Sequence, residues 1–161
     1  MTYSLNLIII KKEVSGLKKR YIWIFACVLF TWFIFGRSLK DAVDSSAESS
    51  VFAEIYSYIY KFLFSEIPEN PVEVVRKLAH VAEYAIHGIL LCNVFSTFKG
   101  KIKGNISYIM FFGLLTACTD EFIQLSSYGR AGLVTDIFID FAGTLTGIII
   151  ILIFCNLNKQ K

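Results

Sequence analysis

Four long apolar blocks, separated by polar segments, set the pattern of this chain. They cover approximately residues 20–37, 78–98, 105–125 and 133–155. A helix rises about 1.5 Å per residue, so about 20 apolar residues cross the hydrocarbon core of a bilayer. The pattern therefore predicts four transmembrane helices in a single membrane domain that spans residues 1–161.

The first block is the shortest, and it follows the basic residues Lys18, Lys19 and Arg20. Its run "YIWIFACVLFTWFIFG" is longer than the apolar region of a signal peptide, which is about 7–15 residues, and it lacks a small-residue cleavage site. We interpret it as a retained anchor that reaches the length of a span through its polar flanks.

The segment between the first two blocks, residues 38–77, has two parts. The Ser-rich stretch "SLKDAVDSSAESS" is typical of a turn. The stretch from Val51 to Ile67, "VFAEIYSYIYKFLFSEI", is rich in Tyr and Phe, and Tyr favours the headgroup layer of a membrane. It predicts an interfacial helix on the outer leaflet. A helix packed within an ordinary loop is the alternative.

The composition supports an all-α, polytopic membrane protein, a four-helix bundle whose extracytoplasmic loop carries the interfacial helix. Hydrophobic residues make up 55% and charged residues 18% of the 161 residues, with a mean hydropathy of +0.59. Soluble domains contain about 45–50% apolar and about 25% charged residues. The basic residues form no single stripe, which argues against nucleic acid as a partner. The four cysteines fall in different apolar blocks, so we expect small buried hydrophobic residues and no disulfide framework.

The distribution of charge predicts an orientation. Ten of the sixteen Lys and Arg residues lie in the two terminal segments or in the short connection at 99–103. The positive-inside rule then places both termini in the cytoplasm. Twelve of the thirteen acids fall in the outer loop or in the outer halves of the last three spans, so we expect the polar chemistry to face outside.

The second block begins with the most unusual stretch, "RKLAHVAEYAIHGILL". On a helix, Arg76, His80, Glu83, Tyr84 and His87 share one stripe, because they follow the i, i+3, i+4 and i+7 spacing. Ionisable groups in a span face the bundle interior or a cavity, and they are functional more often than not. His87 lies deepest and could equally be an ordinary hydrogen-bonding group of the core.

The third and fourth blocks carry matching polar faces near the same end. Asp120, Glu121 and Gln124 end the third, and Asp136 and Asp140 begin the fourth, above a small-xxx-small glycine pair at residues 143 and 147. An acid at mid-bilayer costs about 2.5–3.5 kcal/mol, so these groups should be paired, protonated or hydrated. We expect Arg76, Lys77, Arg130 or His80 as partners. The alternative is a network that only fixes the register of the helices.

Three chemistries fit such a cluster. A divalent cation could bind the acids and His80, although the absence of an H-E-x-x-H pair makes this the less favoured one. Glu83 and His80 could act as general acid and base on a lipid-linked substrate. Basic side chains could hold a phosphate or carboxylate. The candidate catalytic residues are His80, Glu83, Asp120, Glu121 and Asp136, and the candidate binding residues are Arg76, Lys77, Tyr84, Gln124, Arg130 and Asp140.

The order and spacing of these residues resemble the VanZ-like family. The motif is a basic residue, His and Glu-Tyr entering one helix, Asp-Glu-x-x-Gln ending the next, and Gly-Arg followed by two Asp and two Gly. It is carried here by Lys77, His80, Glu83, Tyr84, Asp120, Glu121, Gln124, Gly129, Arg130, Asp136, Asp140, Gly143 and Gly147. The Ser cluster 45–50 also resembles the outer loop of the family. At His87 the family pattern leads us to expect an apolar residue.

This resemblance implies a small four-helix membrane protein with a shared polar site. The family's namesake is an accessory factor that gives low-level tolerance to teicoplanin-type lipoglycopeptides, which implies a partner such as the drug or a lipid-linked cell-wall precursor. The first hypothesis is therefore a membrane factor that binds such a ligand at the outer leaflet. The alternatives are an intramembrane hydrolase or transferase with a Glu/His pair, and a purely structural assembly subunit.

Overall fold

The computed structural model describes the backbone of residues 2–40, 42–98, 102–128 and 132–157, and the side chains of these residues except those of 2–13 and 42–45. The elements are helices and one 3₁₀ turn, and the described residues contain no strand. In chain order they are α1 (Thr2–Ser38), α2 (Ala42–Phe64), α3 (Pro71–Ser96), η1 (Ile102–Asn105), α4 (Ile106–Gln124) and α5 (Val134–Leu157). The all-α class is therefore confirmed.

Four segments are long and apolar enough to cross a membrane: Val14–Ser38, Pro71–Ser96, Ile102–Gln124 and Val134–Leu157. This confirms the number of spans, and the helices that contain the first two spans begin before their apolar blocks do. The helix of the second span, α3, begins at Pro71, whereas the apolar block begins near residue 78. Pro in the first turn fits a helix start, and the polar turn that follows continues the helix. The first helix likewise begins well before residue 20.

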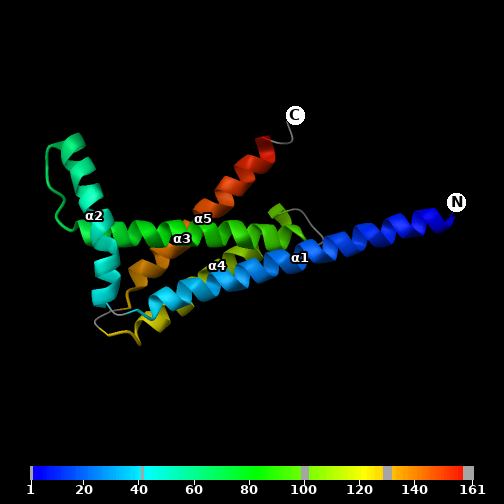
Figure 1. Ribbon diagram of the computed structural model, residues 1–161, viewed down its shortest axis with the longest axis horizontal. Coiled ribbons are helices and arrows are strands. Elements are labelled where there is room, and N and C mark those ends of the chain that lie inside the picture. Colours follow the sequence, from blue (N-terminus) through cyan, green and yellow to red (C-terminus); the bar gives the residue numbers. More distant parts are fainter. Residues whose placement is uncertain (1, 41, 99–101, 129–131, 158–161) are drawn as a thin grey trace.

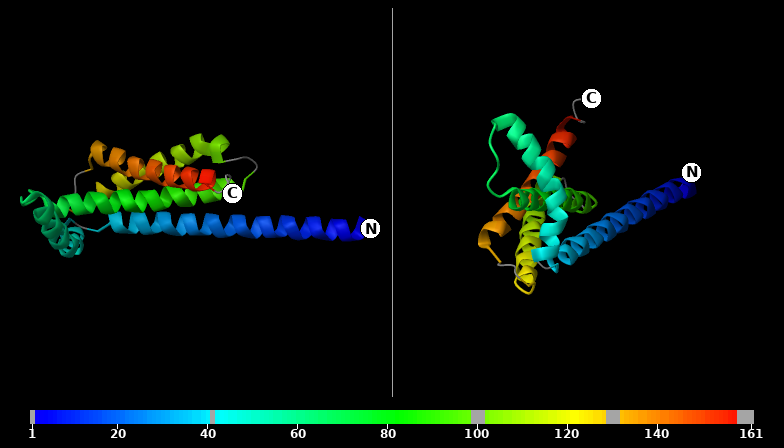
Figure 2. Two further views of the ribbon diagram at one scale, coloured as in Figure 1. Left: turned by 90° about the horizontal axis from the view of Figure 1, so that it is seen from above. Right: turned by 60° about the vertical axis from the view of Figure 1, so that its left-hand side comes forward.

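Helix α3 is the central element of the bundle and packs against α5, α2, α1 and α4. In Figure 1, α5 crosses α3 diagonally, while α2 lies across the end where α3 begins. Figure 2 shows α1 running alongside α3 and continuing past it, with the N- and C-termini at the end of the bundle opposite α2. An even number of spans requires this placement of the termini.

The Ser-rich stretch that we expected to form a turn is helical, since α2 starts at Ala42. Ser is a poor helix former, but intrinsic propensity is a weak preference that packing overrides. Ser49 and Ala53 lie one turn apart and are buried, and these small residues allow α2 to approach α3 closely. The large side chains of Ile55, Tyr58 and Phe62 project from the other side of α2 and are exposed. The interfacial position of α2 stays a prediction.

The glycines of the predicted small-xxx-small pair lie where α5 meets α3. A Cβ atom at Gly143 would come within 2.6 Å of a backbone oxygen of α3, and one at Gly147 would overlap the carbonyl oxygen of Ala85. On the facing helix, a Cβ at Gly88 would lie 2.5 Å from a carbonyl oxygen of α5. The two backbones therefore touch, as expected for small residues at a helix contact in a membrane.

The half of the bundle nearer the termini has an apolar core. Its buried side chains come from α1, α3, α4 and α5, and they are Cys27, Leu91, Cys92, Val94, Ile109 and Ile148. All four cysteines are free, as expected. The expectation that all are buried is wrong for Cys118, which is exposed on α4, and only partly right for Cys155. Both lie on outer faces of spans, where a thiol contacts lipid as readily as protein.

Candidate functional site

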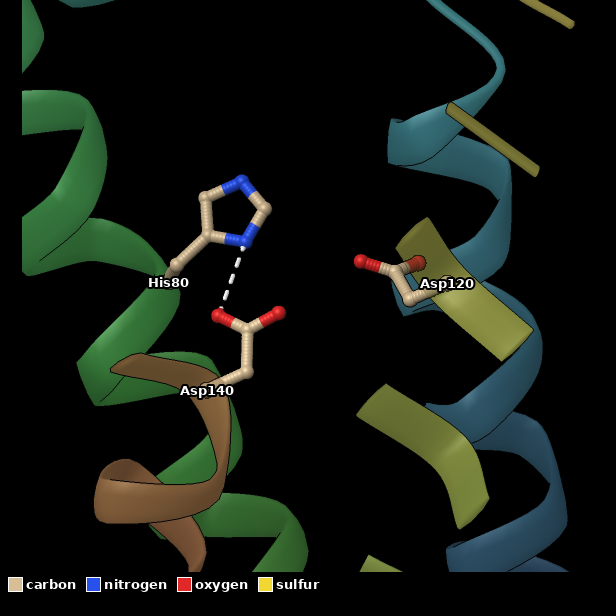
Figure 3. Close-up of side chains that lie close together, drawn as sticks. All are labelled: His80, Asp120 and Asp140. Atoms are coloured by element: carbon tan, nitrogen blue, oxygen red, sulfur yellow. Dashed lines mark ion pairs between the residues drawn. The ribbon is translucent and has the colours of Figure 1, made fainter. Parts of the chain in front are cut away.

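The polar stripe of α3 faces the other spans near the end covered by α2. His80 lies on this stripe, and its Nδ1 is 3.3 Å from Oδ1 of Asp140 on α5. The Asp140 side chain is 1% exposed, whereas that of His80 is 20% exposed. Figure 3 shows the two groups side by side, with the carboxylate of Asp120 facing them from α4. Three spans thus each contribute one ionisable group to a common centre.

Asp120 is fully buried and held by two hydrogen bonds. The Ser38 hydroxyl, at the end of α1, donates to Oδ1 over 2.6 Å. The Gln124 amide, one turn further along α4, donates to Oδ2 over 3.2 Å. Hydrogen bonds to an ionised carboxylate are stronger than neutral ones, so these two fix the orientation of the group.

Glu83 is paired with a residue that sequence reasoning did not assign to the site. Its Oε1 lies 3.1 Å from Nε of Arg37, near the end of α1. The same guanidinium lies 3.9 Å from Glu48 on α2, which is also hydrogen-bonded to Lys40. Arg37 therefore joins a buried acid to an exposed one.

Arg37 and Ser38 were missed because the end of the first block was treated only as a flank of the span. The available signal was positional. A basic residue and a hydroxyl end the first span at the same end of the bundle as the acids of the other three. Groups at one depth in different spans can meet, whatever their separation in sequence.

Tyr84 and His87 lie deeper on the same stripe. Tyr84 is fully buried beside Asp120 and Asp140, and its hydroxyl makes no well-oriented hydrogen bond among the described residues. The His87 ring shares a hydrogen bond of 3.2 Å between Nε2 and Oγ1 of Thr31. His87 has no acid partner among the described residues, which matches the alternative of an ordinary core histidine.

Glu121 and Asp136 lie at the edge of the cluster. Glu121 accepts a hydrogen bond of 2.8 Å from the backbone N–H of Leu133, and its second oxygen is buried without a hydrogen bond among the described residues. It therefore fastens the segment that enters α5. Asp136 occupies the first turn of α5, where a helix dipole favours a negative charge. Neither contacts His80 directly in this arrangement.

Of the basic residues expected as partners, His80 meets Asp140, while Arg76 and Lys77 make other contacts. Lys77 pairs over 2.7 Å with Glu73 on its own helix, and Arg76 lines a separate cavity of about 280 Å³ with Asn70 and Ser46. At the start of α3, Arg76 lies toward α2, whereas Lys77 is close enough to α5 to interact electrostatically with Asp136. Arg130 and Gly129 lie outside the described residues.

A cavity of about 670 Å³ adjoins the cluster, between α1, α2 and the start of α3. One side is polar, with Arg37, Lys40 and Glu48. The other is apolar, with Phe33, Phe52, Val75, Leu78 and Ala79. A cavity lined by both charged and apolar side chains can accept the two halves of an amphiphile.

These features define a helical membrane protein with a buried polar cluster at one end of its bundle. The sequence model of the family described as VanZ/LLP1 matches residues 23–155, so the chain belongs to that family. This confirms the resemblance seen in the sequence. No curated protein and no solved structure matches the chain.

Proposed function

We propose that this protein binds a lipid intermediate of the cell envelope at the outer end of its bundle, and thereby contributes to tolerance of teicoplanin-type lipoglycopeptides. In this proposal the termini are cytoplasmic and the polar cluster faces outside. Membership of the VanZ/LLP1 family supports the membrane setting. The link to lipoglycopeptides comes from the family's namesake alone and is tested below.

The observation that carries the proposal is the position of Arg37 between two acids. Glu48 borders the open cavity, and Glu83 lies in the buried cluster. An anionic headgroup in the cavity would compete with Glu48 for Arg37, while Phe33 and Phe52 offer an apolar surface to its chain. Lipids of the cell wall pathway have this combination of anionic phosphate and long hydrocarbon chain.

The exposed apolar side of α2 suits the same role. Tyr58 and Phe62 are each more than 75% exposed and come from a helix that crosses the end of the bundle. An amphipathic helix of this kind lies in the headgroup layer with its apolar face toward the acyl chains. In that position α2 would border the lipid entrance to the cavity.

The test uses susceptible Gram-positive cells that express the wild type, Glu83→Gln or Glu73→Gln. Surface binding of a fluorescent lipoglycopeptide and growth inhibition by it are compared at equal membrane levels of protein. Glu83→Gln removes the partner of Arg37, and the matched control Glu73→Gln removes an exposed acid from the same helix. We expect wild type and Glu73→Gln to lower binding and Glu83→Gln to have lost this effect.

Two outcomes would count against the proposal. If the wild type leaves drug binding and growth unchanged, tolerance is not a function of this chain. If Glu83→Gln protects as well as the wild type, the polar cluster is not responsible for the protection. A structural assembly subunit would be indicated if the variants changed only the amount of a partner complex in the membrane.

The His80–Asp140 pair favours a second candidate, a hydrolase or transferase that acts on the same lipid. A carboxylate 3.3 Å from Nδ1 orients an imidazole so that its other nitrogen can take up a proton. Incubating the purified protein with a radiolabelled lipid-linked phosphate would show turnover, and His80→Gln should abolish it. Binding without any product would leave the first candidate in place.

A further inference from the structure

The buried cluster contains more acid than base. Four acidic side chains lie within it, namely Glu83, Asp120, Glu121 and Asp140, and all but Glu83 belong to residues less than 5% exposed. Of the basic groups that the structure describes, Arg37 contacts only Glu83 of these four, and His80 lies beside Asp140. Ionised acids in an apolar interior require an opposing charge or protonation.

The geometry concentrates three of these groups at one point. His80, Asp120 and Asp140 each offer one ligand atom, and the three atoms lie within 4.8 Å of one another. In an occupied zinc site, ligand atoms at about 2.0–2.2 Å from the ion lie about 3.4 Å apart. Small rotations of the two carboxylates would close the difference, since both groups already point toward the common centre (Figure 3).

Asp140 provides an independent indication that a ligand belongs here. Its side chain is 1% exposed, and neither of its oxygens makes a hydrogen bond among the described residues; the ion pair with His80 uses only Oδ1. In Figure 3 the other oxygen points into the space between Asp140 and Asp120. A buried carboxylate oxygen with no donor is costly, and a cation at this place would remove the cost.

We propose that His80, Asp120 and Asp140 bind one divalent transition-metal ion, Zn²⁺ or Mn²⁺. One imidazole nitrogen and two carboxylate oxygens suit these ions better than Mg²⁺, which is bound by oxygen ligands and water. The ion replaces the direct contact between His80 and Asp140 and balances two of the negative charges. Three protein ligands leave coordination positions for water or for an oxygen of an anionic ligand.

The surroundings of the ligands are those of a metal centre. Ser38 and Gln124 hydrogen-bond to the Asp120 carboxylate, and such outer partners orient ligands and raise metal affinity about 10–100-fold. The ligands come from α3, α4 and α5, and Ser38 comes from α1. The ion therefore links all four spans.

Metal binding goes beyond the lipid function proposed above and does not depend on it, so the experiment measures the metal alone. Full-length protein with a tag free of histidine is purified in detergent, treated with chelator and desalted. Zn²⁺, Mn²⁺ or Mg²⁺ is then added, and bound metal is measured by mass spectrometry alongside the thermal unfolding temperature. We expect about one Zn²⁺ or Mn²⁺ per chain and a higher unfolding temperature on binding.

Matched variants locate the site. His80→Gln and Asp140→Asn should reduce affinity at least about 100-fold, and Ser38→Ala about 10–100-fold. The controls His87→Gln and Glu73→Gln change a buried histidine outside the three ligands and an acid outside the cluster, and they should bind as the wild type does. Asp140→Asn removes a buried charge, so its metal-free form should still unfold cooperatively.

Any one of four results would overturn the proposal. The first is that the wild type binds neither Zn²⁺ nor Mn²⁺ above the level of the His80→Gln variant. The second is that Asp140→Asn retains wild-type affinity. The third is that the controls lose as much affinity as the ligand variants. The fourth is that Mg²⁺ binds as tightly as the two transition metals, which would remove the basis for assigning the imidazole as a ligand.

Discussion

The two halves of the bundle are buried to similar degrees but are held together in different ways. Near the termini, side chains such as Leu91 and Ile109 fill a purely apolar core. Near α2, Asp120 and Asp140 are equally buried and meet His80 and Ser38. Lipid chains are as apolar as leucine, so apolar contacts choose weakly among partners in a membrane. The polar half therefore specifies which helix faces meet, and the apolar half fills the space behind them.

The largest effect on both halves should follow from Gly147→Leu. A Cβ atom there already overlaps the backbone of Ala85, so the larger side chain would separate α3 from α5. We expect a loss of about 3 kcal/mol or more in the free energy of unfolding, at the upper end for overpacked sites. Unfolding of the purified wild type and Gly147→Leu in mixed detergent measures this difference in free energy.

Gly36→Leu is the matched control for this substitution, because a Cβ at Gly36 meets nothing within 4 Å. It should change the free energy of unfolding by no more than about 0.5 kcal/mol, as is usual for outward-facing substitutions. An equal loss in both variants would contradict the close contact of α3 with α5.

A smaller effect, confined to the polar half, is expected for Ser38→Ala. The variant removes the donor 2.6 Å from the Asp120 carboxylate and should cost about 1.5–3 kcal/mol of unfolding free energy. Thr144→Val is the contrasting variant, since the Thr144 hydroxyl is buried and makes no hydrogen bond among the described residues. Val at that position should leave stability unchanged or raise it. If Thr144→Val lost more stability than Ser38→Ala, the hydrogen bond from Ser38 would not be stabilising Asp120.

The apolar half should respond less than the core of a soluble protein does. Ile109 is fully buried, yet Ile109→Ala should cost only about 1–2 kcal/mol, because in a membrane the transfer of the lost methyl groups from water does not contribute and the cavity remains the main cost. Leu115→Ala on the exposed face of α4 should cost almost nothing. Unfolding of the two variants in detergent measures the difference between them. If Ile109→Ala lost more stability than Ser38→Ala, the apolar half would contribute more than the polar half, contrary to the comparison above.

The smallest effect concerns the attachment of α2. The hydrogen bond from Lys40, aided by the charges of Lys40 and Arg37, lowers the pKa of the Glu48 carboxyl below its usual value. A carboxyl whose pKa is lowered by folding contributes stability above its unfolded pKa and loses it as the pH falls through the folded value. Acid should therefore loosen α2 from α1. The protection factors for hydrogen exchange in α2, which are corrected for the pH dependence of the intrinsic rate, should fall below about pH 4 in the wild type, and those of Glu48→Gln should already be lower at pH 7.

The comparison also explains what the sequence could predict. The stripe of His80 and Glu83 and the acids of the third and fourth blocks were predicted to meet, because helical spacing and depth in the membrane restrict where polar groups can go. The structure brings together groups from these three spans, as predicted. The pair Gly143 and Gly147 was predicted to form a close helix contact, and the structure identifies α3 as the partner.

The partners of these groups could not be predicted in the same way. Arg76 shares the stripe with His80, but α2 occupies the space that it faces, and Arg37 from α1 pairs with Glu83. Which neighbour covers a given turn depends on the angles at which helices cross, and these angles arise from packing. The helical Ser-rich start of α2 was missed for a related reason, since its stability comes from burial of Ser49 and Ala53.

The distribution of the cluster over several spans has a consequence for biosynthesis. His80 enters the membrane with α3, whereas Asp140 arrives only with α5, the last span. At about 5–20 residues per second, the ribosome finishes Asp140 roughly 3–12 s after His80. During this interval the polar face of α3 is inserted without its final partner, so α4 or the translocation machinery must shield it. A nascent chain halted before α5 would carry His80, Glu83 and Asp120 without Asp140 and without the glycine surface that packs on α3, so the cluster can form only after the last span has been inserted.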